Sequence, residues 1–170
     1  MGGSILQSLL IRHGELVDRA VLLATFPNYS EVQHQWLDGE LAVRKASDPL
    51  VVSISGMPWL FTPKMLSDHK ALIEVGRADI AGPLPTSNEA YAVQAATLRE
   101  YDSTPGLPNV QNTVLVLVGA EDVLTPTSQS VEMAELIPNA KLRILPRGGH
   151  AVPLEYPAET VGAIEQFLAR

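Results

Sequence analysis

The C-terminal part of the chain alternates strand and helix patterns, and this alternation restricts the fold more than any other feature. Thr113–Gly119 (TVLVLVG) is an almost continuously apolar run, typical of a strand that is covered on both faces. A helical pattern follows over 128–137, a second strand over 141–146 and an amphipathic helix over 157–170. Strands that alternate with helices pair in parallel through right-handed crossovers. The pattern therefore predicts an α/β fold.

The N-terminal part adds a helix and a third strand. The helical pattern over 4–13 has one face formed by Ile5, Leu6, Leu9, Leu10 and His13. Gly14 follows at the position where a helix end often needs a left-handed residue. Residues 19–25 (RAVLLAT) are a short apolar run with a turn signal after it, which indicates a buried parallel strand. We expect a partial parallel sheet of about three strands.

The region from 26 to 107 has a different character and divides the chain. Its helical patterns, among them 31–47, 63–80 and 87–103, are short, and prolines interrupt the region at positions 27, 49, 58, 63, 83 and 85. We interpret it as an irregular helical insertion. The predicted organisation is a core formed by 1–25 and 108–170, with the insertion between them.

Composition limits the class of protein. A chain of 170 residues with 46% hydrophobic and 18% charged residues fits one folded domain. The net charge of −7 disfavours nucleic acid and anionic membranes as partners. The absence of cysteine excludes disulfides and thiolate chemistry. No basic leader pattern and no run of about 18 apolar residues stand in the sequence, so a cytoplasmic protein is the default expectation.

Two residues that could carry chemistry follow neighbouring strands. Asp122 comes just after the 113–119 strand, and His150 follows the 141–146 strand across Gly148 and Gly149. Ligands of open α/β sheets bind at the carboxyl ends of the strands. Each residue alone has an ordinary interpretation, Asp122 as a turn or helix-start carboxylate and His150 as a solvent-facing loop residue. Together at successive strand ends they favour an aspartate that orients a histidine general base.

The motifs around these residues resemble those of a known family. G-A-E-D-x-x-x-P (119–126), I-P-N-A (137–140) and G-G-H-x-x-x-x-E-x-P (148–157) are similar to the C-terminal part of a lidded α/β-hydrolase. The resemblance is greatest to esterases, enol-lactone hydrolases and carbon–carbon bond hydrolases. It implies that Asp122 and His150 are the acid and base of a catalytic triad and that Glu155 and Pro157 are structural. It also implies that the insertion is a helical lid and that the substrate is a small acyl compound.

The start of the sequence resembles the same family. M-G-G followed by a helix is similar to the segment directly after the nucleophilic serine of the elbow G-x-S-x-G. The resemblance implies that Met1 occupies the position whose backbone N–H helps to form the oxyanion hole. Ser4 lacks the glycine that an elbow needs two residues later, and we interpret it as an early helix residue. We therefore expect the nucleophile and the N-terminal half of the core to be absent and the chain as given to have little or no activity.

Alternatives to an enzyme remain open on the same residues. The chain is, in one alternative, an inactive truncated product or an interaction remnant. In the other it is half of a complex that a partner or a swapped dimer completes. In the chain as given, the 19–25 strand becomes an exposed apolar edge, which favours self-association.

The aromatic residues of the insertion include candidates for a substrate pocket. Trp36, Trp59 and Phe61 are the residues that we assign to substrate binding, although packing of the insertion onto itself is the more frequent use of such side chains. His34 and His69 are expected at the surface. Neither a metal-ligand spacing nor a glycine-rich phosphate loop stands in the sequence, so we expect no cofactor.

Overall fold

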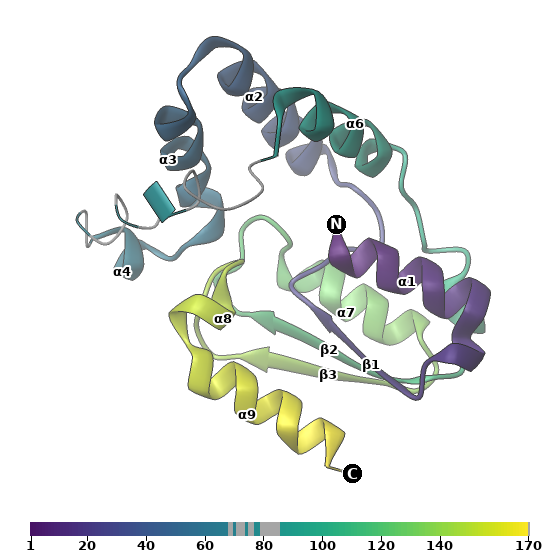
Figure 1. The fold of residues 1–170 in the computed structure, drawn as a ribbon. Coiled ribbons are helices and arrows are strands. Elements are labelled where there is room, and N and C mark those ends of the chain that lie inside the picture. The colour runs from purple at the N-terminus through teal and green to yellow at the C-terminus, as the bar shows by residue number, and fades with distance from the viewer. Residues whose placement is uncertain (68–69, 71–73, 75–76, 79–85, 170) are drawn as a thin grey trace.

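The computed structural model describes residues 1–67, 70, 74, 77–78 and 86–169, and a three-stranded parallel sheet lies at its centre (Figure 1). The strands β1 (Arg19–Leu23), β2 (Thr113–Gly119) and β3 (Ala140–Leu145) are paired in the order β1-β2-β3. Val114 of β2 stands in register with Ala20 on one side and Ala140 on the other. The predicted α/β class and parallel sheet are confirmed, and β1 forms one edge of this sheet.

Helices cover both faces of the sheet, as the alternating pattern requires. On one face α1 (Gly2–His13) and α7 (Thr127–Leu136) pack against the even-numbered positions of β2. On the other face α9 (Pro157–Leu168), preceded by the short helix α8 (Val152–Glu155), packs against the odd-numbered positions. Each face of β2 therefore contributes to a separate apolar cluster, and the strand is buried from Val114 to Gly119.

The segment between β1 and β2 is helical and lies opposite α9 in Figure 1. Its described α-helices are α2 (Glu31–Ala46), α3 (Pro49–Leu60), α4 (Pro63–Leu66) and α6 (Asn88–Arg99). The short 3₁₀ helices η1 (Gly14–Leu16) and η2 (Leu107–Asn109) precede β1 and β2. The predicted patterns over 31–47 and 87–103 correspond to α2 and α6. Much of the predicted pattern over 63–80, with His69, lies outside the described residues.

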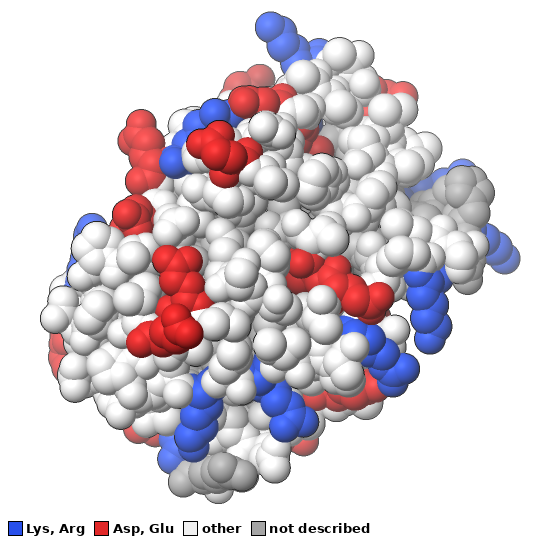
Figure 2. Space-filling model, turned by 180° about the vertical axis from the view of Figure 1, so that it is seen from behind, with Lys and Arg blue, Asp and Glu red and all other residues white. Residues whose placement is uncertain are grey.

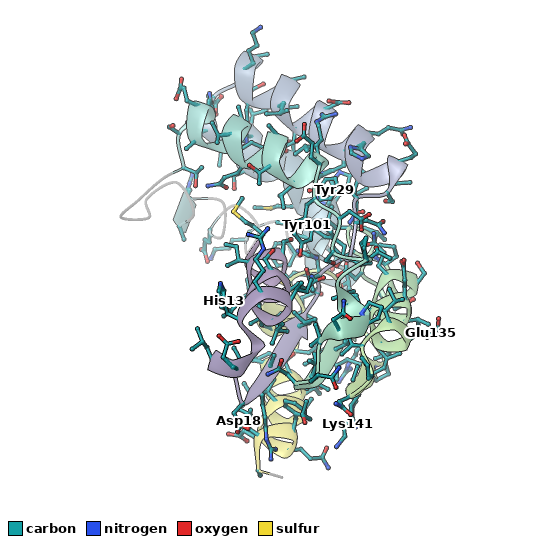
Figure 3. All side chains as sticks on the ribbon, turned by 90° about the vertical axis from the view of Figure 1, so that its right-hand side faces the viewer. His13, Asp18, Tyr29, Tyr101, Glu135 and Lys141 are labelled. Carbon is teal, nitrogen blue, oxygen red and sulfur yellow. The ribbon has the colours of Figure 1, made fainter. Side chains whose placement is uncertain are left out.

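Aromatic side chains fill the junction between this helical segment and the sheet. Figure 3 shows Tyr29 and Tyr101 between the two parts of the molecule. The Phe26 ring contacts both edge-on, with ring centroids 4.7 Å from Tyr29 and 6.4 Å from Tyr101. Tyr101 also donates a hydrogen bond of 2.9 Å to the carbonyl oxygen of Ser4 in α1. The junction is therefore packed and hydrogen-bonded on this side.

The buried face of α1 differs from the predicted one. Ser4, Gln7 and Leu10 face the interior, whereas Ile5 is 63% exposed and His13 is exposed. Both ends of the buried Gln7 amide are hydrogen-bonded: its Nε2 donates to Phe26 O at 3.0 Å, and its Oε1 accepts from Ser103 Oγ at 2.7 Å. Periodicity follows apolar residues, so it missed a face held by polar contacts with a distant segment.

Gly14 also has a role different from the predicted one. Its φ of −57° is right-handed, because the chain continues into η1 rather than reversing at a left-handed cap. A Cβ at this position would lie 2.7 Å from Asn112 Oδ1, and Asn112 Nδ2 donates to Gly14 O at 2.9 Å. Close approach, rather than positive φ, therefore explains the glycine. Similarly, β1 ends at Leu23 rather than at Thr25, because Ala24 adopts a φ of 45°.

On the face shown in Figure 2, acidic and basic side chains lie among one another. None of the described helices combines the length and the apolar character needed to cross a membrane.

The two polar residues on the buried face of α1 give a paired test of stability. Gln7→Met removes both hydrogen bonds and leaves Phe26 O without its partner, so we expect the free energy of unfolding to fall by about 1–3 kcal/mol. Ser4→Ala removes a buried hydroxyl that has no hydrogen-bond partner in the described structure, and we expect no loss. Urea unfolding of both variants checks this difference, and equal stabilities would contradict it.

Candidate active site

Asp122 is held in a tight turn directly after β2. Its Oδ1 accepts hydrogen bonds from the backbone N–H groups of Leu124 at 2.9 Å and Thr125 at 2.8 Å. Its Oδ2 accepts from the hydroxyl of Thr125 at 2.7 Å. A short acidic side chain that bonds to the backbone two and three residues ahead stabilises such a turn. The Asp122 side chain is therefore fixed by its own turn and is 0% exposed.

The turn after β3 carries His150 and interlocks with the turn after β2. A Cβ on Gly119 would lie 2.1 Å from the carbonyl oxygen of Gly148, so the approach of the two backbones requires glycine at 119. Gly148 itself has a φ of 99°, which strongly favours glycine. Glu121 joins the two turns: its N–H donates to Gly148 O at 3.0 Å, and its carboxylate accepts from Gly148 N at 2.9 Å.

This interlocking brings the two predicted residues together. His150 Nδ1 lies 3.1 Å from Asp122 Oδ2, and the histidine side chain is 27% exposed. Because a carboxylate only accepts hydrogen bonds, Nδ1 carries the proton and donates it. Nε2 is then the ring nitrogen with a lone pair, so it is the atom that can accept a proton. The geometry is that of an aspartate that orients a histidine base, while the catalytic roles of both stay a prediction.

Thr125 contacts both members of this pair and was missed by sequence reasoning. Its Oγ1 lies 3.2 Å from His150 Nδ1 as well as 2.7 Å from Asp122 Oδ2. The sequence does place the Thr125 hydroxyl three residues after Asp122, a spacing that permits a contact between the two side chains within one turn. Nothing in that spacing indicated a histidine from position 150.

Glu155 ties the His150 turn to the helical segment before β2. One carboxylate oxygen accepts from Gly149 N at 2.6 Å, and the other accepts from the N–H and hydroxyl of Thr62 at 2.8 and 2.6 Å. Beside it, Ala151 N donates to Leu60 O at 2.8 Å. Ala151 is thus bonded directly to the end of α3, and Gly149 is connected to Thr62 through the Glu155 carboxylate.

Gln33 of α2 makes the corresponding connection to the Asp122 turn. It is buried, and its Nε2 donates to Leu124 O at 2.9 Å. Its Oε1 accepts from Gln129 Nε2 at 3.0 Å and from Ser30 N at 2.8 Å, where the Ser30 and Gln33 side chains form a capping box at the start of α2. The start of α2 is therefore attached to the turn that holds the carboxylate.

A cavity of about 470 Å³ lies between these turns and the inserted helices. His150 and Thr125 line it together with residues 1–3, the end of β1 and helices α2 and α6. Its phenols are neutral near pH 7, and burial moves them further from ionisation, because it raises the pKa of Tyr91 to about 12 and raises the pKa of Tyr29. The other lining side chains are apolar or carry amides and hydroxyls, so its described wall is formed without Lys, Arg, Asp or Glu.

The three predicted substrate-binding residues separate in the structure. Trp36 lines the cavity beside His150. Trp59 instead lines a depression between α2 and α3, with its ring centroid 6.4 Å from that of Trp36. Phe61 is buried in a cluster with Met57. Trp59 and Phe61 lie at the C-terminal end of α3. Because α3 is apolar around most of its circumference, the sequence pattern did not predict which of its sides faces the cavity.

Within the described residues, no serine side chain is hydrogen-bonded to His150. Ser4 and Ser130 are buried with Oγ atoms that have no hydrogen-bond partner in the described structure, and Ser55 donates to Val52 O within α3. In the described ranges the hydroxyl that meets His150 is that of Thr125. Among the described residues, no three His, Asp or Glu side chains gather in a group that could hold a metal ion.

Comparison with known proteins gives one consistent family. A family model described as "Alpha/beta hydrolase family" matches residues 1–163. The chain is 27% identical over 99% of its length to a putative carbamate hydrolase RutD from Caulobacter sp., covering 62% of that protein. It is 28% identical over 100% of its length to 3-oxoadipate enol-lactonase 2 of Acinetobacter baylyi, covering 61% of it. The chain thus spans less than two thirds of the length of these relatives.

Solved structures share the fold over almost the whole chain. The putative non-heme bromoperoxidase BpoC of Mycobacterium tuberculosis superposes with a TM-score of 0.84 at 25% identity, covering 98% of this chain and 63% of that one. The enol-lactonase of Burkholderia xenovorans superposes with a TM-score of 0.87 at 20% identity, covering 100% and 63%. The latter likeness establishes the fold.

The contacts of Glu155 generate a paired test. Glu155→Gln replaces one acceptor oxygen by an NH₂ donor that faces another donor, so we expect a loss of about 1–3 kcal/mol in the free energy of unfolding. We also expect faster amide exchange at Ala151. Glu159→Gln makes the same charge change beside exposed Arg147 and should leave exchange at Ala151 unchanged. Urea unfolding and hydrogen exchange distinguish the two, and similar behaviour of both variants would contradict this role of Glu155.

Proposed function

Because the chain belongs to the alpha/beta hydrolase family, we propose that it supplies the acid and base of a serine hydrolase acting on small carboxylic esters or lactones. The observation that carries the proposal is the 3.1 Å contact between His150 Nδ1 and Asp122 Oδ2 beside the cavity. Family membership, the hydrolase relatives and this geometry support the same reaction class. The inserted helices then act as the lid that covers the substrate.

In the proposed mechanism His150 moves one proton in each half-reaction. A serine oxygen attacks the substrate carbonyl carbon while Nε2 takes the hydroxyl proton, and the carbonyl π electrons pass to its oxygen. When the tetrahedral intermediate collapses, the C–O bond to the leaving group breaks and Nε2 returns the proton to the leaving alkoxide. Water then repeats the two steps on the acyl-serine. The second ring proton stays on Nδ1 of His150 throughout, hydrogen-bonded to Asp122, whose negative charge stabilises the imidazolium.

The serine is proposed to come from outside residues 1–170. Residues 1–3 line the same cavity as His150, and in the family the segment directly after the elbow G-x-S-x-G stands next to the nucleophile. A serine next to Met1 would then stand beside the cavity, with the N–H of Met1 as one oxyanion-hole donor. The segment carrying it would belong to the same polypeptide or to a second chain that completes the sheet beside β1.

Covalent labelling tests where the nucleophile is. A fluorophosphonate reacts with the activated serine of such an enzyme, and peptide mapping by mass spectrometry identifies the labelled residue. In protein from the native source we expect the label on a serine outside residues 1–170. His150→Ala should lower hydrolysis of a chromogenic ester by about 10³-fold or more, and Ser4→Ala should leave it unchanged. A label on Ser4, or on another serine within the chain, would sink the nucleophile assignment.

The described side chains that line the cavity include no Lys, Arg, Asp or Glu, and in the proposed active form the Met1 nitrogen is a peptide amide rather than an ammonium, so the cavity predicts a preference for neutral acyl groups. A carboxylate placed there would lose its hydration without gaining a cationic partner from the described lining. We expect kcat/KM for 4-nitrophenyl butyrate to exceed that for 4-nitrophenyl hemisuccinate, which has the same chain length, by about tenfold or more. The comparison is made on the active form that labelling identifies, and equal values for the two esters would contradict it.

A further inference from the structure

Thr125 occupies the space between the proposed acid and base. Its hydroxyl oxygen lies 2.7 Å from Asp122 Oδ2 and 3.2 Å from His150 Nδ1, while these two atoms lie 3.1 Å from each other. The three polar atoms therefore form a closed triangle. Thr125 is 1% exposed, so water does not compete for these contacts from its side.

The direction of each hydrogen bond in the triangle follows from the donors available. A threonine hydroxyl has one proton, and the shorter contact to the anionic carboxylate takes it. The Thr125 oxygen then offers lone pairs to Nδ1–H of His150, which also faces Asp122 Oδ2. The Nδ1 proton is shared between two acceptors that belong to different residues, and the imidazole plane is held from two directions.

The backbone holds the hydroxyl in this place. Thr125 N donates to Asp122 Oδ1, and the next residue, Pro126, favours an extended conformation at 125. A β-branched side chain also has few rotamers, so little freedom is lost when the hydroxyl points at the pair. The position is thus pre-organised before any substrate arrives.

We propose that Thr125 is a positioning residue that fixes the orientation of the His150 ring through its hydroxyl. A role of Thr125 in catalysis rests on the proposed function, whereas the effect of its hydroxyl on the orientation of the His150 ring does not depend on that function. The simpler alternative is that Thr125 only closes the Asp122 turn. That alternative requires the backbone N–H of Thr125 and the packing of its side chain, and it assigns nothing to the contact with Nδ1.

Two substitutions at the same position separate these interpretations. Thr125→Val keeps the shape and removes the hydroxyl, whereas Thr125→Ser keeps the hydroxyl and removes the methyl group. The readout is the His150 Nδ1 proton in ¹⁵N-labelled protein, by its chemical shift and its exchange with water. We expect exchange in Thr125→Val to be about tenfold faster than in the wild type, the equivalent of one hydrogen bond, and Thr125→Ser to match the wild type.

The outcomes decide the proposal in either direction. An unchanged Nδ1 proton in Thr125→Val overturns it, and so does a Thr125→Ser variant that exchanges as fast as Thr125→Val, because packing would then be the cause. If Thr125→Val does not fold, the wild type provides the test: the Thr125 hydroxyl proton should be slowly exchanging and show a cross-peak to the His150 Nδ1 proton. Its absence overturns the proposal.

The measurement is independent of hydrolysis. It needs neither substrate nor nucleophile. If Nδ1 exchange is faster in Thr125→Val and unchanged in Thr125→Ser, while the label falls on a serine inside residues 1–170, the proposed function is refuted and the inference about Thr125 stands. In the active form, a loss of kcat with unchanged KM in Thr125→Val, restored in Thr125→Ser, is the expected kinetic counterpart.

Discussion

The approach of two backbone turns at Gly119 and Gly148 governs the geometry of the site. Parallel pairing of β2 with β3 ends both strands at the same edge of the sheet, and the missing side chain of Gly119 lets the carbonyl of Gly148 come close. Glu121 then bonds to Gly148 through both its backbone and its side chain. Asp122 and His150 meet because each lies only a few residues beyond this contact, where little chain freedom is left.

The inserted helices form part of the same framework. Gln33 connects α2 to the turn that holds Asp122, and Glu155 connects the start of α4 to the turn that holds His150. Both groups are buried or half-buried, and their donors and acceptors have partners, which is the condition under which polar networks add rigidity. A displacement of α2 or of the α3–α4 junction relative to the sheet breaks these bonds. The cavity and the acid–base pair are therefore structurally coupled.

Segments with one strong physical signal were predicted well. β2 has the predicted bounds Thr113–Gly119, because a strand buried on both faces must be continuously apolar. The helix starting at Pro157 and the parallel order of the strands also follow from local pattern and from the handedness of crossovers. Prediction failed where a distant polar partner decided the outcome, as for Gln7 with Phe26 and for Gly14 with Asn112.

By itself the sequence determined the α/β class, the strand order along the chain and the positions of an aspartate and a histidine after neighbouring strands. These features depend on periodicity and on short-range turn chemistry, which a single chain displays locally. Only the tertiary structure decided that Thr125 completes a triangle with the pair, that Trp36 lines the cavity while Phe61 is buried, and that Glu155 reaches Thr62. The contacts of Thr125 with His150 and of Glu155 with Thr62 join residues far apart in the chain, and their distances depend on how strands and helices pack, which no local pattern encodes.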